Sequence, residues 1–262
     1  MEKNLMPLLF IGHGSPMNAI EDNEFTKNFV RVAKEIERPK AIVCISAHWF
    51  TNGTKVTAME KPKTIHDFFG FPQELYHIDY PANGDIELAN EIKNLFSPVS
   101  VELNNDWGLD HGTWSILRHM YPDADIPVVQ ISIDYNEHTQ YHFDLSKKLS
   151  SLRSKGILII GSGNIVHNLG KIDFKNIETS DYGYDWAKSA QNNVDASIVS
   201  GDFNFLIDYK KDGNDLNMAI PTPEHFLPLI YILGLKEENE KIEFFNNVLV
   251  GGSISMTSLK IS

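Results

Sequence analysis

Residues 8–17 read Leu-Leu-Phe-Ile-Gly-His-Gly-Ser-Pro-Met, an apolar run that stops abruptly at turn residues. Such a run predicts a short buried strand that ends in a loop. Gly12 and Gly14 leave the backbone on both sides of His13 free to bend tightly or to approach a ligand closely. We therefore expect the imidazole of His13 at the tip of a strand, where open α/β sheets place their ligand sites.

Two more histidines follow predicted strands in the same way. The apolar run Ala41–Ser46 is followed by His48, and Ile157–Ile160 leads through a short loop to His167. Because the carboxyl ends of parallel strands lie along one edge of a sheet, His13, His48 and His167 are expected to converge. Convergent imidazoles suit Zn²⁺ or Fe²⁺. Without a cysteine cluster to form a closed structural zinc site, a metal here is expected to keep an open position for chemistry.

A fourth candidate ligand is His225, in the stretch Thr222-Pro223-Glu224-His225-Phe226. This stretch predicts the start of a helix, because proline is tolerated at an early helical position. Consecutive helical residues point about 100° apart, so only one of Glu224 and His225 is expected to face the metal. The sequence leaves open which one it is. Two histidines with a carboxylate would be the familiar non-haem iron arrangement.

The rest of the chain alternates between helical and strand patterns. Helices are expected at Glu24–Glu37, Asp85–Phe96 and Glu137–Lys155, and two more within Tyr182–Tyr209. Another is expected to follow the stretch Trp107–Trp114 and to end at His119, and the one that opens at Thr222–Phe226 is expected to end at Leu233. Further strands are expected at Val56–Met59, Val99–Leu103 and Pro127–Ile133, with a closing pair at Ile242–Val250 and Ser253–Ile261. This alternation predicts an α/β fold with a mostly parallel central sheet, helices on both faces, and the metal site at the carboxyl ends of the strands. No repeat or linker interrupts residues 1–262, which we expect to form a single domain.

A long segment from Thr64 to Pro81 has many aromatic residues and no clear periodicity. Loops of this length are usually either functional or disordered, and the aromatic content argues against disorder. We expect the loop to fold over a pocket and to contact a substrate through His66, Asp67 and Tyr76. A local hydrogen-bonded pair of His66 and Asp67 that only stiffens the loop is the alternative.

The composition excludes several classes of function. The net charge of −12 disfavours nucleic acid and anionic membrane surfaces as partners. No apolar run approaches the ~20 residues that span a bilayer, and the N-terminus lacks the apolar core of a secretory signal, so a cytoplasmic location is expected. The single cysteine, Cys44, reads as a small buried hydrophobic residue. The stretch Gly161–Asn164 fits neither a P-loop nor a dinucleotide fingerprint.

Seven motifs together carry a family resemblance, in order along nearly the whole chain. They are Gly12–Pro16, Ser46–Phe50, Ile65–Phe68, Trp107–Gly112, Tyr121–Pro127, Gly161–Asn164 with Val166–Leu169, and Thr222–Phe226. With these motifs the chain resembles the class III extradiol ring-cleaving dioxygenases of the LigB superfamily, and most of all their 4,5-DOPA dioxygenase branch.

The resemblance implies a single metal ion held by His13, His48 and His225. It implies Fe²⁺ for activity, with Zn²⁺ able to occupy the same site. His167 would either act as acid and base or complete the metal shell when substrate is absent. His111 would lie behind the ligands or contact the substrate.

The implied reaction inserts both atoms of O₂ into a catechol such as DOPA, and the aromatic loop would supply an apolar wall for the ring. One departure from the family pattern is Phe69, which stands where glycine is usual. A bulky ring there would narrow or reshape the pocket, so the substrate is less firmly implied than the chemistry.

Two other functions use the same residues. A zinc-dependent hydrolase is compatible with a three-histidine site, because zinc can activate water there. A non-catalytic metal-binding interaction protein is the second alternative. The remaining histidines are expected on the surface or satisfied in the core; they are His77, His119, His138 and His142. A monomer or a small homo-oligomer is expected.

Overall fold

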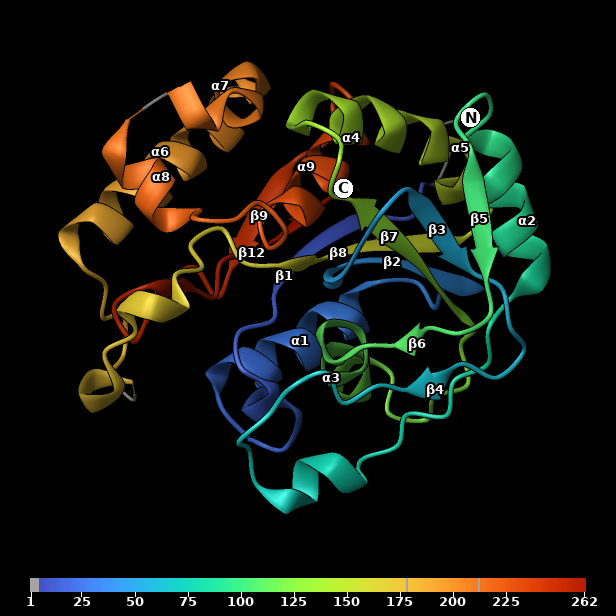
Figure 1. Cartoon of the computed structure of the whole chain (residues 1–262), viewed down its shortest axis with the longest axis horizontal. Helices are drawn as coiled ribbons and strands as arrows, with labels where there is room; N and C mark the ends of the chain where they lie inside the picture. Colours follow the sequence, from blue (N-terminus) through green and yellow to red (C-terminus); the bar gives the residue numbers. More distant parts are fainter. Residues whose placement is uncertain (1–4, 178, 212) are drawn as a thin grey trace.

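A computed structural model of the chain describes residues 5–177, 179–211 and 213–262. Its centre is an eight-stranded sheet (Figure 1). From one edge to the other the strands are β5 (Val101–Asn104), β3 (Thr54–Thr57), β7 (Val128–Asp134), β2 (Ala41–Thr51), β8 (Ile157–Gly163), β1 (Leu8–Gly12), β12 (Ser258–Ile261) and β9 (Ile242–Phe245). Two short pairs lie outside this sheet: β4 (Lys63–Thr64) with β6 (Gly108–Leu109), and β10 (Leu249–Val250) with β11 (Ile254–Ser255).

The middle of the sheet is parallel, as the sequence predicts. Strands β7, β2, β8 and β1 all run in the same direction. The antiparallel pair β12 and β9 continues the sheet beyond β1, and β3, antiparallel to β7, continues it on the other side together with β5. The carboxyl ends of the four parallel strands therefore meet at one edge of the sheet.

Helices cover both faces of the sheet, which confirms the predicted α/β architecture. On one face lie α1 (Glu24–Glu35) and α3 (His111–Met120). On the other lie α2 (Ile86–Leu95), α4 (Thr139–Ser146), α5 (Ser150–Arg153) and α9 (Leu227–Gly234). Three helices gather at one side of the molecule, drawn in orange in Figure 1: α6 (Asp185–Ser200), α7 (Phe203–Ile207) and α8 (Asn214–Ala219). Short 3₁₀ turns are η1 (Pro16–Ala19), η2 (Gln73–His77), η3 (Lys147–Leu149), η4 (Leu169–Lys171), η5 (Phe174–Asn176) and η6 (Tyr209–Lys211).

The hydrophobic core is divided by the sheet into two parts. Along β1, Leu8 and Phe10 point into the core beneath α9, whereas Leu9 and Ile11 point into the core beneath α1 and α3. This alternation follows from the two-residue period of a strand. Cys44 is buried in the second core, as expected.

Side-chain caps fix where three of the predicted helices begin. The Asn23 side chain accepts from the backbone N–H of Thr26 while the Thr26 hydroxyl accepts from the backbone of Asn23, a capping box that starts α1. Asp85 and Asp110 cap α2 and α3 in the simpler way, each accepting a backbone N–H three residues further on. Within the described residues no helix has both the length and the apolar character needed to cross a membrane.

Two local structures differ from the sequence prediction. The helix expected over Glu137–Lys155 is split into α4 and α5 by the 3₁₀ turn η3. At the break, the Ser146 hydroxyl donates to the carbonyl of Phe143, the kind of local hydrogen bond by which serine competes with the helix. The helix expected to open at Thr222 begins only at Leu227, so His225 lies in the turn before α9.

The second strand is also longer than predicted. Strand β2 pairs with β8 up to Ser46, then shifts register and continues beside β7 as far as Thr51. His48 therefore lies inside β2, beyond the point where β2 and β8 separate. Its side chain is nevertheless at the carboxyl edge of the parallel strands, because that separation marks the edge.

Candidate metal centre

Five histidines line one cavity of about 520 Å³ at the carboxyl edge of the sheet. They are His13, His48, His111, His167 and His225. His13 directly follows β1, and His167 follows β8 after a short loop. The expected convergence of imidazoles that lie far apart in the sequence is thus present.

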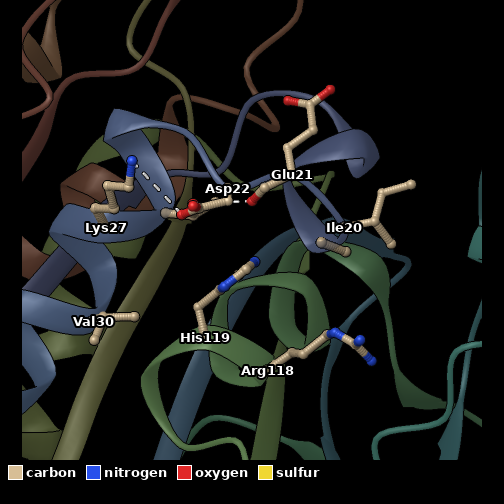
Figure 2. A pocket seen from close by; sticks show the side chains of 9 residues that line it. Ile20, Glu21, Asp22, Lys27, Val30, Arg118 and His119 are labelled. Carbon is tan, nitrogen blue, oxygen red and sulfur yellow. Dashed lines mark hydrogen bonds and ion pairs between the residues drawn. The ribbon is translucent and has the colours of Figure 1, made fainter.

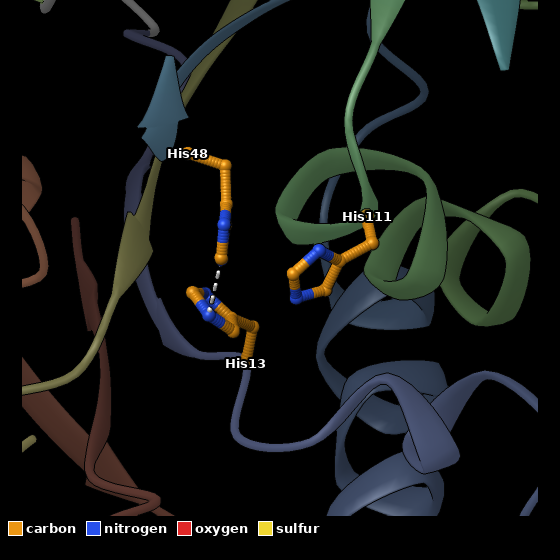
Figure 3. A group of neighbouring side chains, drawn as sticks. All are labelled: His13, His48 and His111. Atoms are coloured by element: carbon orange, nitrogen blue, oxygen red, sulfur yellow. Dashed lines mark hydrogen bonds between the residues drawn. The ribbon is translucent and has the colours of Figure 1, made fainter. Parts of the chain in front are cut away.

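Three of these side chains point toward one another (Figure 3). The nearest ring nitrogens of His13, His48 and His111 all lie within 4.8 Å of one another. The Nε2 atoms of His13 and His48 are 3.1 Å apart. His111 is the first residue of α3, so the N-cap Asp110 fixes where its backbone begins.

His225 lies next to both His13 and His48. The ring centroids of His13, His48 and His225 form a nearly equilateral triangle, with sides of 5.0, 5.4 and 5.1 Å. His111 is placed less evenly, 3.9 Å from His48 and 5.6 Å from His13. Three imidazoles that share one ion are expected to be spaced evenly around it.

His167 and Glu224 complete a second group with His225. The rings of His167 and His225 are stacked, with centroids 3.5 Å apart and an angle of 10° between their planes. Glu224 Oε1 lies 3.3 Å from Nδ1 of His225, and Glu224 is not among the residues that line the cavity. His225 thus faces the cavity and Glu224 contacts it from behind, which answers the question that the sequence left open about their orientation.

The hydrogen bonds of Ser162 define the proton position on His13. The Ser162 hydroxyl donates to the carbonyl of Gly112 at 2.5 Å, and its oxygen lies 3.0 Å from Nδ1 of His13. Because the hydroxyl proton is already donated to Gly112, the Ser162 oxygen accepts a hydrogen bond from Nδ1–H of His13. The Nε2 atom of His13 is therefore left with its lone pair, directed at His48.

Carboxylates play the same part for three other histidines. Asp67 Oδ2 lies 3.1 Å from Nδ1 of His48 and 3.0 Å from Nδ1 of His111, and Oδ1 accepts the backbone N–H of His111. A carboxylate beside Nδ1 favours the tautomer protonated there, which leaves the lone pair on Nε2. Glu224 stands in the same relation to Nδ1 of His225.

These contacts leave a set of buried lone pairs that suits a metal ion. In the described part of the chain, Nε2 of His13 and Nε2 of His48 have only each other as a close polar contact, and two lone pairs 3.1 Å apart repel unless a cation lies between them. A transition metal held by Nε2 atoms, with each Nδ1–H on a carboxylate or hydroxyl, is the arrangement that metal-binding histidines ordinarily have. The donor set therefore fits the metal that the resemblance implies.

Burial favours the neutral form of His13, His167 and His225. It lowers the pKa of His13 and of His225 well below the ordinary value, and the neighbouring histidines lower both further. Burial also lowers the pKa of His167 to about 4. Burial opposes ionisation of Asp67, but contacts with His111 and His48 outweigh it and hold the pKa of that carboxyl well below its usual range. A neutral imidazole is the form that binds a metal ion.

The aromatic loop folds over this cavity, as predicted. Asp67, Phe68, Phe69 and Phe71 line it. His66 and Tyr76, which were expected to contact a substrate, do not line the cavity. Instead Nε2 of His66 lies 3.0 Å from the carbonyl of Ile78, and the Tyr76 hydroxyl donates to the carbonyl of Phe68, so both fasten the loop to itself.

Two parts of the site were not found from the sequence. The first is Ser162, in the Gly-Ser-Gly stretch that ends β8. Its position at the carboxyl end of a strand is the sequence signal that could have identified it. The second part is an apolar wall formed by Leu169, Ile172, Phe174, Ile177, Val250 and Ile254. Its first four residues alternate irregularly with lysine and aspartate, so neither a helical nor a strand period marked them.

A close backbone contact explains one glycine at the site, and a positive φ explains another. A Cβ on Gly163 would lie 2.1 Å from the carbonyl oxygen of His225, and that carbonyl accepts the N–H of Asn164 at 2.9 Å. The turn that carries His225 is therefore held directly against the end of β8. Gly14, after His13, has a φ of +64°, which side-chain-bearing residues rarely adopt.

A larger hollow of about 700 Å³ lies elsewhere, between η1, α1 and α3 (Figure 2). Its charged side chains have both signs, and Lys27 lies 3.8 Å from Asp22. His119, the histidine in it, has its Nε2 2.6 Å from the backbone carbonyl of Asn18. The charges of this hollow are of both signs and its histidine already has a backbone partner. The cavity lined by the five histidines is therefore the stronger candidate functional site.

The other histidines behave as expected. His77 and His138 are exposed. His142 is buried, and the expectation of a satisfied core histidine holds for one of its ring nitrogens: Nδ1 lies 3.2 Å from the Tyr231 hydroxyl, whereas Nε2 has no hydrogen-bond partner among the described residues.

Comparison with known proteins shows the family of the chain. The sequence pattern of the family described as catalytic LigB subunit of aromatic ring-opening dioxygenase matches residues 7–258. A protein of Escherichia coli K12 named 4,5-DOPA dioxygenase extradiol is 45% identical, over 100% of this chain and 96% of the relative. A protein of the same name from Beta vulgaris is 37% identical, over 100% of this chain and 98% of the relative.

A solved structure agrees as well. The crystal structure of an uncharacterized protein from Escherichia coli K12 superposes with a TM-score of 0.85 and 41% sequence identity, covering 98% of this chain and 100% of the other. The family pattern, the full-length relatives and the converging histidines lead to one conclusion: this chain belongs to the LigB family of aromatic ring-opening dioxygenases.

Proposed function

We propose that this protein is an extradiol dioxygenase that opens the ring of a catechol with both atoms of O₂, using one non-haem metal ion. The observation that carries the proposal is that His13, His48 and His225 line one largely apolar cavity, each with a hydroxyl or a carboxylate beside its Nδ1 atom. The names of the relatives, 4,5-DOPA dioxygenase extradiol, support a catechol such as DOPA as the substrate class.

His13, His48 and His225 would hold the ion. Their nearly equal ring separations and the Nδ1 partner of each support this choice. When bound, the ion supplies Lewis acidity toward the catechol oxygens and the electron chemistry that O₂ requires. We propose Fe²⁺ as the active metal, because Zn²⁺ also binds imidazoles but has no redox chemistry.

His167 would move the proton of the second catechol hydroxyl. A pKa of about 4 keeps it neutral at pH 7, so that a ring nitrogen can accept the proton and return it later. Stacking on His225 holds the His167 ring at the cavity wall, beside the proposed ligands. His111, whose Nε2 faces the His13–His48 pair, would accept a hydrogen bond from the substrate.

Asp67 would act as a positioning residue rather than as a direct substrate contact. Its carboxylate lies between His48 and His111 and fixes the orientation of both rings. The aromatic residues next to it would form a wall for the catechol ring and exclude water from it.

The partners, location and oligomeric state of the protein stay predictions. The net charge of −12 supports a protein without nucleic-acid or membrane partners. We also propose a cytoplasmic location and a monomer or small homo-oligomer.

The test is an oxygen-uptake assay on protein loaded anaerobically with Fe²⁺. With DOPA and related catechols we expect O₂ consumption and a yellow ring-opened product, and neither in the absence of O₂. Turnover without O₂ would instead indicate a hydrolase. No turnover of any catechol by protein with confirmed iron occupancy would overturn the proposal.

A further inference from the structure

The entrance to the histidine cavity is apolar, although it is open to solvent. We call it the mouth and define it by Phe69, Leu169, Phe174 and Ile177. Their side chains are 91%, 62%, 77% and 41% exposed. All four line the same cavity as the histidines, so the mouth is continuous with the proposed reaction site.

Two separate segments supply the mouth. Phe69 comes from the aromatic loop, whereas Leu169, Phe174 and Ile177 come from the stretch after β8 that contains η4 and η5. Large apolar side chains left exposed around a cavity commonly mark the place where an apolar group binds. The cavity volume of about 520 Å³ is well above the ~150 Å³ that holds a benzene ring, so there is room beyond a catechol for a ring substituent.

The same cavity has no group suited to a charged substituent. Among the described residues that line it, none is lysine or arginine. Asp67 carries the one carboxylate in that lining, and this carboxylate already contacts His48, His111 and the backbone N–H of His111. A substrate carboxylate would meet no cation there, and a substrate ammonium would have to compete with two imidazoles.

We propose that the mouth selects catechols whose ring substituent is uncharged and apolar over catechols that carry an amino-acid side chain. The substituent would lie between Phe69 and Phe174 while the diol reaches the histidines. An apolar chain gains by leaving water for this surface, whereas a carboxylate and an ammonium lose hydration without gaining partners. This inference rests on the proposed ring-cleavage activity and narrows its substrate.

The test compares DOPA with 4-propylcatechol, which has the same three-carbon chain without the two charges. For the Fe²⁺-loaded full chain, we expect kcat/KM for 4-propylcatechol to exceed that for DOPA by about tenfold or more. Anaerobic titration, which needs no turnover, is expected to give a lower Kd for 4-propylcatechol than for DOPA. Equal values, or a preference for DOPA in both measurements, would overturn the inference.

Variants of the mouth assign the preference to its residues. Phe174→Ser and Phe69→Ser should each lower the ratio of the two kcat/KM values by several-fold, and Phe174→Leu should largely preserve it. Val199→Ser is the matched control, because Val199 is 73% exposed on α6 and does not line the cavity. If the control variant lowers the ratio as much as the mouth variants do, the mouth does not select the substrate.

Two lysines near the mouth provide the opposite test. Lys171 and Lys175 are exposed on the same segment as Phe174 and do not line the cavity. Lys171→Gln and Lys175→Gln should leave the ratio unchanged. If either variant selectively weakens DOPA, that lysine binds the substrate carboxylate and the inference is wrong.

The outcomes keep the two proposals apart. Tighter anaerobic binding of 4-propylcatechol with no turnover of either compound would support the proposed selectivity of the mouth and contradict the proposed dioxygenase activity. Efficient turnover that favours DOPA would do the reverse. Dopamine and 3-(3,4-dihydroxyphenyl)propionate carry one charge each, so they show which charge the mouth rejects.

Discussion

The inner and outer parts of the cavity differ in burial, in polarity and in hydrogen bonding. The inner part, which we call the floor, consists of the five histidines and Asp67. Three of these side chains are buried, and Asp67, Glu224 and Ser162 lie beside the Nδ1 atoms of four of the histidines. The side chains of the mouth are exposed and apolar, so they form no hydrogen bonds. In the proposed function the floor would carry out the chemistry and the mouth would select the substrate.

The strongest test of the floor is the removal of a proposed ligand. His13→Ala should abolish stable metal binding and reduce ring cleavage by at least about 10³-fold, because several kcal/mol of charge stabilisation depend on the ion. Metal analysis after dialysis and an oxygen-uptake assay measure the two effects. His138→Ala, an exposed histidine, is the control; full metal content in His13→Ala would remove His13 from the ligand set.

His167 separates proton transfer from metal binding. His167→Ala should retain the metal but lower kcat by about 10²- to 10⁴-fold, the usual range for a lost general base. Metal content and kcat measured on the same preparation distinguish the two roles. Loss of the metal instead would mean that His167 belongs to the ligands.

Asp67→Asn tests the positioning role. The amide keeps the size but loses the charge beside Nδ1 of His48 and of His111, so metal affinity should fall by about 10- to 100-fold. Competition with a chelator gives the affinity. Asp22→Asn, on an exposed carboxylate far from the floor, should change nothing.

His142 tests whether acid sensitivity also comes from a buried histidine outside the floor. Burial lowers the pKa of His142 to about 4, so the unfolded chain binds this proton first as the pH falls. The stability that depends on neutral His142 is complete above pH ~6.5 and is lost toward pH 4, by at most about 3 kcal/mol. Denaturant unfolding at several pH values should show a shallower loss for His142→Gln, by about one proton, than for the wild type. An unchanged slope, or the same change in the exposed control His138→Gln, would contradict this account.

The smallest effect is expected at the mouth. Phe69→Ser should change the free energy of unfolding by no more than about 0.5 kcal/mol, because the side chain is 91% exposed. Thermal and denaturant unfolding would detect a larger loss. Such a loss would show that Phe69 packs as part of the core, and the contrast between floor and mouth would weaken.

The histidines of the floor could be predicted from the sequence, whereas of the mouth only Phe69 could. Strand runs that end at glycine and histidine are local signals, and parallel pairing brings them to one edge without further information. The orientation of His225 relative to Glu224 depended on a turn against Gly163 that no periodicity encodes. His66 and Tyr76 were assigned to the substrate because aromatic loops often bind one, but tertiary contacts turned them to the loop backbone instead.

The apolar wall escaped prediction for a different reason. Leu169 and Phe174 are exposed, and their proximity to Phe69 comes from the path of two loops rather than from regular structure. The extension of β2 past Ser46 was missed because the register shift beside β7 depends on long-range pairing.

The aromatic loop places Asp67 and Phe69 only two residues apart, one in the floor and the other in the mouth. The backbone between them is tied down by the Tyr76 hydroxyl on the Phe68 carbonyl and by the buried Phe68 ring. Residue 69 can therefore change size during evolution while the carboxylate behind the two imidazoles stays in place. If the mouth selects the substrate as proposed, single substitutions at this position would change specificity without altering the reactive centre.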